Sequence, residues 1–79
     1  MKVVNKPIDV IAVFYSSGDM KPIRFRINNK AVPVDRILKQ YDERIAGNIR
    51  KCFVCINNEV LVYEIKYEIS TGRWVLFKI

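Results

Sequence analysis

Tight-turn residues between short apolar segments constrain this chain more than any other feature. Asn28-Asn29 and Asn57-Asn58 each separate two segments rich in β-branched and aromatic residues. Because asparagine tolerates the positive φ angles of tight hairpin turns, each pair predicts an antiparallel hairpin. The predicted hairpin strands are residues 23–27 with 30–34, and residues 52–56 with 60–69.

Two further segments have strand character. Residues 8–15 are apolar at both alternating positions and end at a turn cluster, Ser16 to Asp19. Residues 73–79 follow the turn sequence Ser70-Thr71-Gly72. A strand that is apolar on both sides is typical of a covered sheet or a closed barrel.

The segment 23–27 alternates apolar and basic residues. Because side chains alternate across a strand, we expect Ile23, Phe25 and Ile27 to point inward. Arg24 and Arg26 should then stand together on the solvent face, about 7 Å apart along the strand.

Residues 35–45 fit two structures. Ile37, Leu38, Tyr41 and Ile45 share one helical stripe, and Asp35 is a suitable N-cap. Ile37, Tyr41 and Ile45 also share one strand parity. The sequence therefore leaves this segment as either a bent strand or one short helix.

At 79 residues, the chain has room for one core, so residues 1–79 should form a single domain. Five to six short strands with tight turns predict a mainly β fold, a small antiparallel barrel of the SH3-like or a similar kind. Closure would also hide the strand edges of so small a sheet.

Composition argues against an enzyme. The chain contains no histidine, the commonest general base and metal ligand at neutral pH, and its three glycines are isolated turn residues. We therefore expect no catalytic residues, no cofactor and no metal site.

Cys52 and Cys55 form the only match to a chemical motif, Cys-x-x-Cys. Positions three apart in a strand point to opposite faces, so we expect packing side chains, with a redox or metal role as the alternative.

The amino-terminal segment lacks the apolar core of a signal peptide, and the longest apolar stretch, 10–15, is too short to span a bilayer. The expected location is the cytoplasm, without membrane contact.

The net charge of +6 is compatible with a polyanionic partner. Basic residues interleaved with aromatics on a β surface are typical of small single-strand-binding barrels. The candidate nucleic-acid-binding residues are Arg24, Arg26, Lys66, Trp74 and Lys78, with Tyr67 as another aromatic. Lys66 lies between Glu64 and Glu68 on one strand face, which we expect to be solvated. The predicted function is a non-catalytic binding module for nucleic acid; the alternative is a protein–protein adaptor.

Several segments resemble one known family. They are Pro22-Ile23-Arg24-Phe25-Arg26, Val34-Asp35-Arg36-Ile37-Leu38, Val62-Tyr63-Glu64-Ile65 and Thr71-Gly72-Arg73-Trp74 with the residues that follow. This pattern is similar to a small bacterial β-domain of unassigned function, which stands alone or beside Y-family, error-prone DNA polymerases. The resemblance covers residues 22–79. It implies a barrel-like fold with 35–45 as a bent strand, and a partner that is nucleic acid or a DNA-repair protein.

Overall fold

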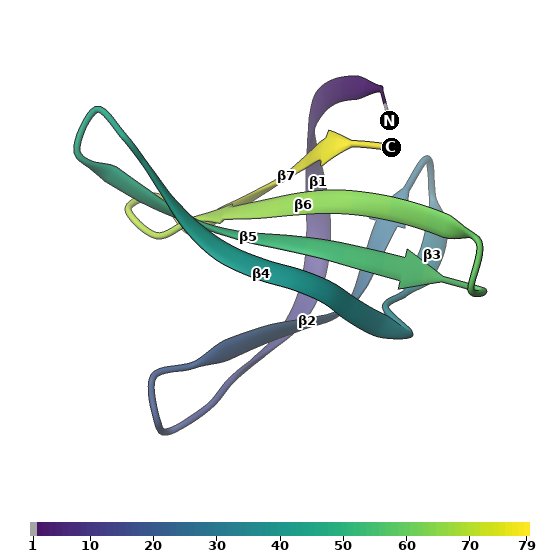
Figure 1. The fold of residues 1–79 in the computed structure, drawn as a ribbon, viewed down its shortest axis with the longest axis horizontal. Helices are drawn as coiled ribbons and strands as arrows, with labels where there is room; N and C mark the ends of the chain where they lie inside the picture. Colours follow the sequence, from purple (N-terminus) through teal and green to yellow (C-terminus); the bar gives the residue numbers. More distant parts are fainter. Residues whose placement is uncertain (1) are drawn as a thin grey trace.

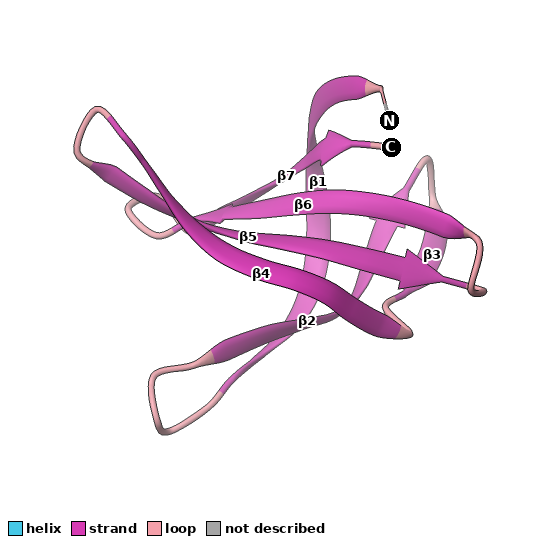
Figure 2. Cartoon of the chain, in the orientation of Figure 1, coloured by secondary structure: helices cyan, strands magenta, loops and turns pink. Residues whose placement is uncertain are grey.

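The computed structural model describes residues 2–79, which form seven antiparallel strands and no helix (Figures 1 and 2). The strands are β1 (Val3–Phe14), β2 (Met20–Ile27), β3 (Lys30–Pro33), β4 (Arg36–Ile45), β5 (Asn48–Asn57), β6 (Leu61–Glu68) and β7 (Arg73–Lys78). The predicted small antiparallel β fold is confirmed, with seven strands in place of five to six.

The segment that fitted both a helix and a strand is strand β4. It pairs with β5 from Arg36 to Ile45, with one bulge between Ile37 and Lys39. Tyr41 then lies opposite Cys52, and Ile37 reaches the core from the other face. Pairing with a long neighbouring strand outweighs the local helical propensity, because strand structure depends on its neighbours.

The sheet follows the chain almost without interruption. Its order is β3-β2-β1-β7-β6-β5-β4, so the first strand pairs with the last. Reciprocal backbone hydrogen bonds of 2.8 and 2.9 Å join Lys2 and Ile79, and the two termini lie together in Figure 1. The result is a curled half-barrel that is open between β3 and β4.

The opening between β3 and β4 is bridged at one end. The Asp35 amide donates to the Ile56 carbonyl at 3.0 Å. The buried Asn57 side chain donates to the Pro33 carbonyl at 2.9 Å. These bonds hold the β3–β4 connection against the end of β5, which keeps the sheet curled.

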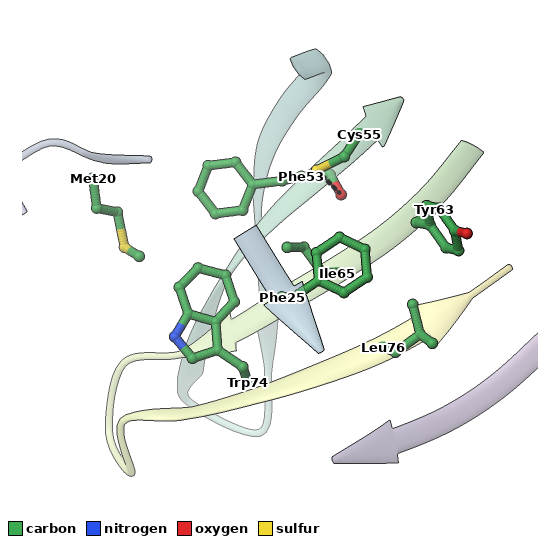
Figure 3. Close-up of a cluster of buried hydrophobic side chains, with 8 residues drawn as sticks. All are labelled: Met20, Phe25, Phe53, Cys55, Tyr63, Ile65, Trp74 and Leu76. Atoms are coloured by element: carbon green, nitrogen blue, oxygen red, sulfur yellow. Dashed lines mark hydrogen bonds between the residues drawn. The ribbon is translucent and has the colours of Figure 1, made fainter. Parts of the chain in front are cut away.

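The core lies inside the curl, where side chains converge from β2, β5, β6 and β7 (Figure 3). Phe25 packs edge-on against Tyr63, with ring centroids 5.3 Å apart, and so joins strands from the two halves of the sheet. The buried cluster comprises Met20, Phe25, Phe53, Cys55, Tyr63, Ile65, Trp74 and Leu76.

Ile23 does not point inward as expected. Ile23 is 39% exposed, whereas Pro22 before it and Phe25 two positions after it are buried. Ile11 pairs with Arg24 and Ala12 with Pro22, so Ile23 is the extra residue of a β-bulge. The bulge shifts the alternation by one position, which a strict period of two cannot anticipate.

The turn prediction is correct for one hairpin and displaced in the other. Asn28 and Asn29 have φ angles of 48° and 66°, as the β2–β3 turn requires. In the β5–β6 turn the positive φ angles belong to Asn58 and Glu59. Asn57 is instead the last residue of β5, where its side chain is needed for the bond to β3.

Candidate nucleic-acid interface

Arg24 and Arg26 stand together on the outside of β2, as predicted. Phe25 between them is 2% exposed and points into the core, so both guanidinium groups project away from it. Both residues are exposed. Within residues 2–79, neither arginine forms an ion pair. We refer to the outer surface around them, over β1, β2 and β3, as the arginine face.

A shallow groove of about 240 Å³ crosses the arginine face. Cross-strand pairing places Asp9 and Ala31 on either side of Arg26, and Ile11 beside Arg24. The groove therefore combines two arginines that form no ion pair within residues 2–79 with the Asp9 carboxylate and the apolar Ile11 and Ala31 side chains. Its lining residues are Asp9, Val10, Ile11, Arg24, Phe25, Arg26 and Ala31.

The structure does not bring the candidate aromatics to the arginine face. Trp74 is 8% exposed and packs in the core, where its ring lies 4.9 Å from the half-buried Tyr67 ring. Both rings lie on the inner side of the sheet, opposite the two arginines. Because a buried ring cannot stack on a base, Trp74 contributes packing at this position.

Lys78 is also separate from the arginine pair. It lies opposite Val3 near the end of β7, while Arg24 lies opposite Ile11 toward the far end of β1. Its ammonium lies 5.5 Å from the centroid of the Phe77 ring, and the residue is half-buried.

Lys66 is buried, and the expectation of a solvated face around it is wrong. Its side chain is 6% exposed, and Nζ lies 2.9 Å from Glu43 Oε2 and 3.7 Å from Glu64 Oε2. The ammonium also lies 3.7 Å from the centroid of the Phe77 ring. Four strands, β4 to β7, bring their outer side chains together here and exclude solvent, so the ammonium is not accessible to a nucleic acid.

The sequence did not predict that Tyr41 and Glu43 belong to this cluster. The Tyr41 hydroxyl donates to Glu64 Oε2 at 3.0 Å, and burial together with this bond raises the pKa of Tyr41. The Tyr41–Glu64 contact and the Glu43–Lys66 contact each join residues 23 positions apart. Only the β4–β5–β6 register creates that spacing, so no local motif signals it.

Cys52 and Cys55 are buried on opposite faces of β5, as the strand spacing predicted. Cys55 belongs to the core, whereas Cys52 lies opposite Tyr41 on the outer side. Burial raises the pKa of Cys55 to about 12 and also raises the pKa of Cys52. Both sulfurs are therefore protonated thiols at neutral pH, which are poor nucleophiles and poor metal ligands.

Over residues 2–79, no group of three or more His, Cys, Asp or Glu side chains is arranged to hold a metal ion. The same part of the chain has no helix that could cross a membrane. No protein-family model, curated protein or solved structure matches the chain. The resemblance to the polymerase-associated domain is untested by these comparisons and stays a prediction.

Proposed function

We propose that this chain is a non-catalytic binding module that contacts the phosphates of a nucleic acid through Arg24 and Arg26. The observation that carries the proposal is a pair of exposed guanidinium groups on one strand face, neither of which has an ion-pair partner within residues 2–79.

The geometry of the pair suits a polyanion. Two residues apart on a strand, the arginines project about 7 Å from each other. This distance is close to the spacing of successive phosphates along one nucleic-acid strand. Arginine also binds phosphate oxygens with two parallel hydrogen bonds, which fixes the contact geometry.

The mode of binding follows from what surrounds the arginines. The neighbouring outer side chains of β1 and β3 are the Asp9 carboxylate and the aliphatic Ile11 and Ala31. The Phe25 ring is buried, so the groove offers no exposed ring for stacking. Backbone contacts carry no direct sequence information. The expected binding is weak, independent of sequence and strongly dependent on salt.

The test measures fluorescence anisotropy of labelled single-stranded and duplex oligonucleotides across a salt series. Replacing both Arg24 and Arg26 with alanine should weaken binding and reduce the slope of log K against log salt by about 2, because each phosphate contact contributes about 0.9 on duplex DNA. Equal slopes for wild type and variant would contradict the proposal.

The control variant removes the same charge elsewhere. Lys39→Ala with Arg44→Ala also lowers the net charge by two, but both residues are exposed on β4, at the opposite edge of the sheet. This variant should retain most of the binding. If both double variants lose binding equally, only net charge matters and the arginine face is not the site.

A protein–protein adaptor is the second candidate, because exposed apolar side chains surround the arginines. Ile11 is 55% exposed, Ile23 39% and Val13 38%. A protein partner would contact these side chains and would be retained after nuclease treatment of the complex. Binding that is lost with nuclease would favour the nucleic acid.

A further inference from the structure

The second half of β1 has a free edge. β1 pairs with β7 only as far as Ile8, and beyond that point it pairs with β2 alone. On the side of residues 10–14 that faces away from β2, no strand is paired, and within residues 2–79 no further backbone hydrogen bond reaches this side. An unpaired edge presents alternating free N–H and C=O groups, a template for another strand.

This free edge is apolar and is exposed on its outer face and, at Phe14, on its inner face, where Val10 and Ala12 are half-buried against the core. Its sequence is Val10-Ile11-Ala12-Val13-Phe14, with no charged residue, proline or glycine. Ile11 is 55% exposed and Val13 38% exposed on the outer face, and Phe14 is 60% exposed on the inner face. We refer to residues 10–14 as the β1 edge.

The sheet's two terminal strands are protected from such pairing in ways that the β1 edge is not. β3 has only four residues and ends in Pro33, which has no amide hydrogen to donate. β4 carries Lys39, Asp42 and Arg44 and contains a bulge. Short length, proline, charge and bulges are the usual devices that keep an edge unpaired. The β1 edge is itself short, at residues 10–14, and the Ile23 bulge of β2 lies opposite Ile11 and Ala12, but the edge carries neither a charge nor a proline.

We propose that the β1 edge pairs antiparallel with the β1 edge of a second copy of this chain. A two-fold axis midway between the Ala12 residues of the two copies places Ile11 opposite Val13 of the second copy, and Val10 opposite Phe14. Every position of the five-residue stretch then meets an apolar residue, and no charge is placed opposite another. The edge is thus complementary to itself, as a two-fold symmetric interface requires.

The structure leaves room for this pairing. Where β1 separates from β7, a notch of about 350 Å³ opens, with Pro7, Gly72 and Arg73 in its wall. In the two-fold register, the turn of the second copy at residues 15–19 comes next to this notch. Asp19 in that turn carries a charge opposite to that of Arg73.

The charge on each copy sets the response to salt. Both copies carry a net charge of +6, so they repel each other when they approach. Salt screens this repulsion and does not weaken apolar contacts. Self-association should therefore strengthen between about 0.05 and about 0.5 M salt, whereas salt weakens nucleic-acid binding. The two proposals predict opposite responses and can fail separately.

The test is sedimentation equilibrium of the full chain from about 10 µM to about 1 mM, because a five-residue edge forms a small interface that associates weakly. A monomer–dimer equilibrium is expected. Ile11→Lys should weaken it at least about tenfold, since a lysine on an edge strand opposes pairing. Ile23→Lys is the matched control: the same substitution on the same outer face, but on β2 and not at the β1 edge.

Val13→Lys is the second variant, used if Ile11→Lys does not give the wild-type circular dichroism spectrum. In parallel, amide hydrogen exchange at residues 10–14 should slow as the protein concentration rises. A monomer at every concentration would overturn the proposal. So would a dimer that both edge variants leave unchanged, or one that Ile23→Lys weakens equally.

Discussion

The Lys66 ammonium lies 2.9 Å from Glu43 Oε2, and the Lys66 side chain is only 6% exposed. Glu43 is on β4 and Lys66 on β6, so the pair spans β5 between them. A buried charge that loses its partner is costly, because the remaining ion has neither water nor a counter-charge. This pair therefore makes stability depend on a residue near the edge of the sheet.

Glu43→Gln should lower the free energy of unfolding by about 1–2 kcal/mol. This is less than the cost of breaking a fully buried pair, because Glu43 is 23% exposed and Glu64 remains 3.7 Å from Lys66. Urea unfolding followed by tryptophan fluorescence measures the difference. The matched control is Glu59→Gln, whose partner Arg36 is 57% exposed, so its cost should stay below about 0.5 kcal/mol. Equal costs for the two variants would contradict this prediction.

Leu76→Ala should destabilise the protein by about 2–5 kcal/mol, because Leu76 is 1% exposed and its removal leaves a cavity inside the curled sheet. Leu61→Ala makes the same change at a position that is 48% exposed, and should cost less than about 1 kcal/mol. Thermal unfolding by circular dichroism compares them. A small effect at Leu76 would mean that the interior of the half-barrel is loosely packed.

Ala46→Asn should stabilise the β4–β5 hairpin by up to about 1 kcal/mol. Ala46 has a φ of 48° and precedes Gly47 at 82°, the backbone of a turn that favours Asn-Gly. Ala31→Asn, on the exposed strand β3, provides the control and should bring no gain. Urea midpoints decide the outcome, and an unchanged midpoint for Ala46→Asn would argue against strain in this turn.

Stability should fall above pH 9. Burial raises the pKa of Cys55 from 9.0 to about 12, so the folded state holds a proton that the unfolded chain releases. The stability that comes from this raised pKa is fully present below pH 9. It is lost as the pH rises toward 12, at up to about 1.4 kcal/mol per pH unit. The raised pKa of Cys52 acts in the same direction.

Urea unfolding at pH 8 and pH 10.5 measures this loss. Because lysines and tyrosines also titrate in that range, Cys55→Ala is the reference: its stability should change less between the two pH values than that of the wild type. An identical pH dependence in both proteins would assign the alkaline loss to other groups.

Local pattern was enough to predict the class of fold and most of its turns. Asn28-Asn29 at positive φ follows from backbone sterics, and the strands β5 and β6 follow from their β-branched and aromatic residues. The exposed Arg24 and Arg26 also follow, because Phe25 between them had to be buried. The choice between helix and strand for 35–45 did not follow, because it depended on pairing with β5.

The residues that make up the candidate site were harder to predict from the sequence than the fold. Lys66 and Trp74 have the chemistry of nucleic-acid contacts, yet both are buried. Their burial depends on which strands lie beside them and on which side the sheet curls. Neither property is encoded within a few residues of either side chain.

By itself, the sequence determined an antiparallel β protein with two exposed arginines on one strand, because turn sterics and the two-residue period of a strand act over short distances. Only the tertiary structure decided that β1 leaves β7 after Ile8, that Ile23 forms a bulge and that Lys66 pairs with Glu43. These features arise from contacts between residues far apart in the chain, whose register is set when the whole sheet closes around one core.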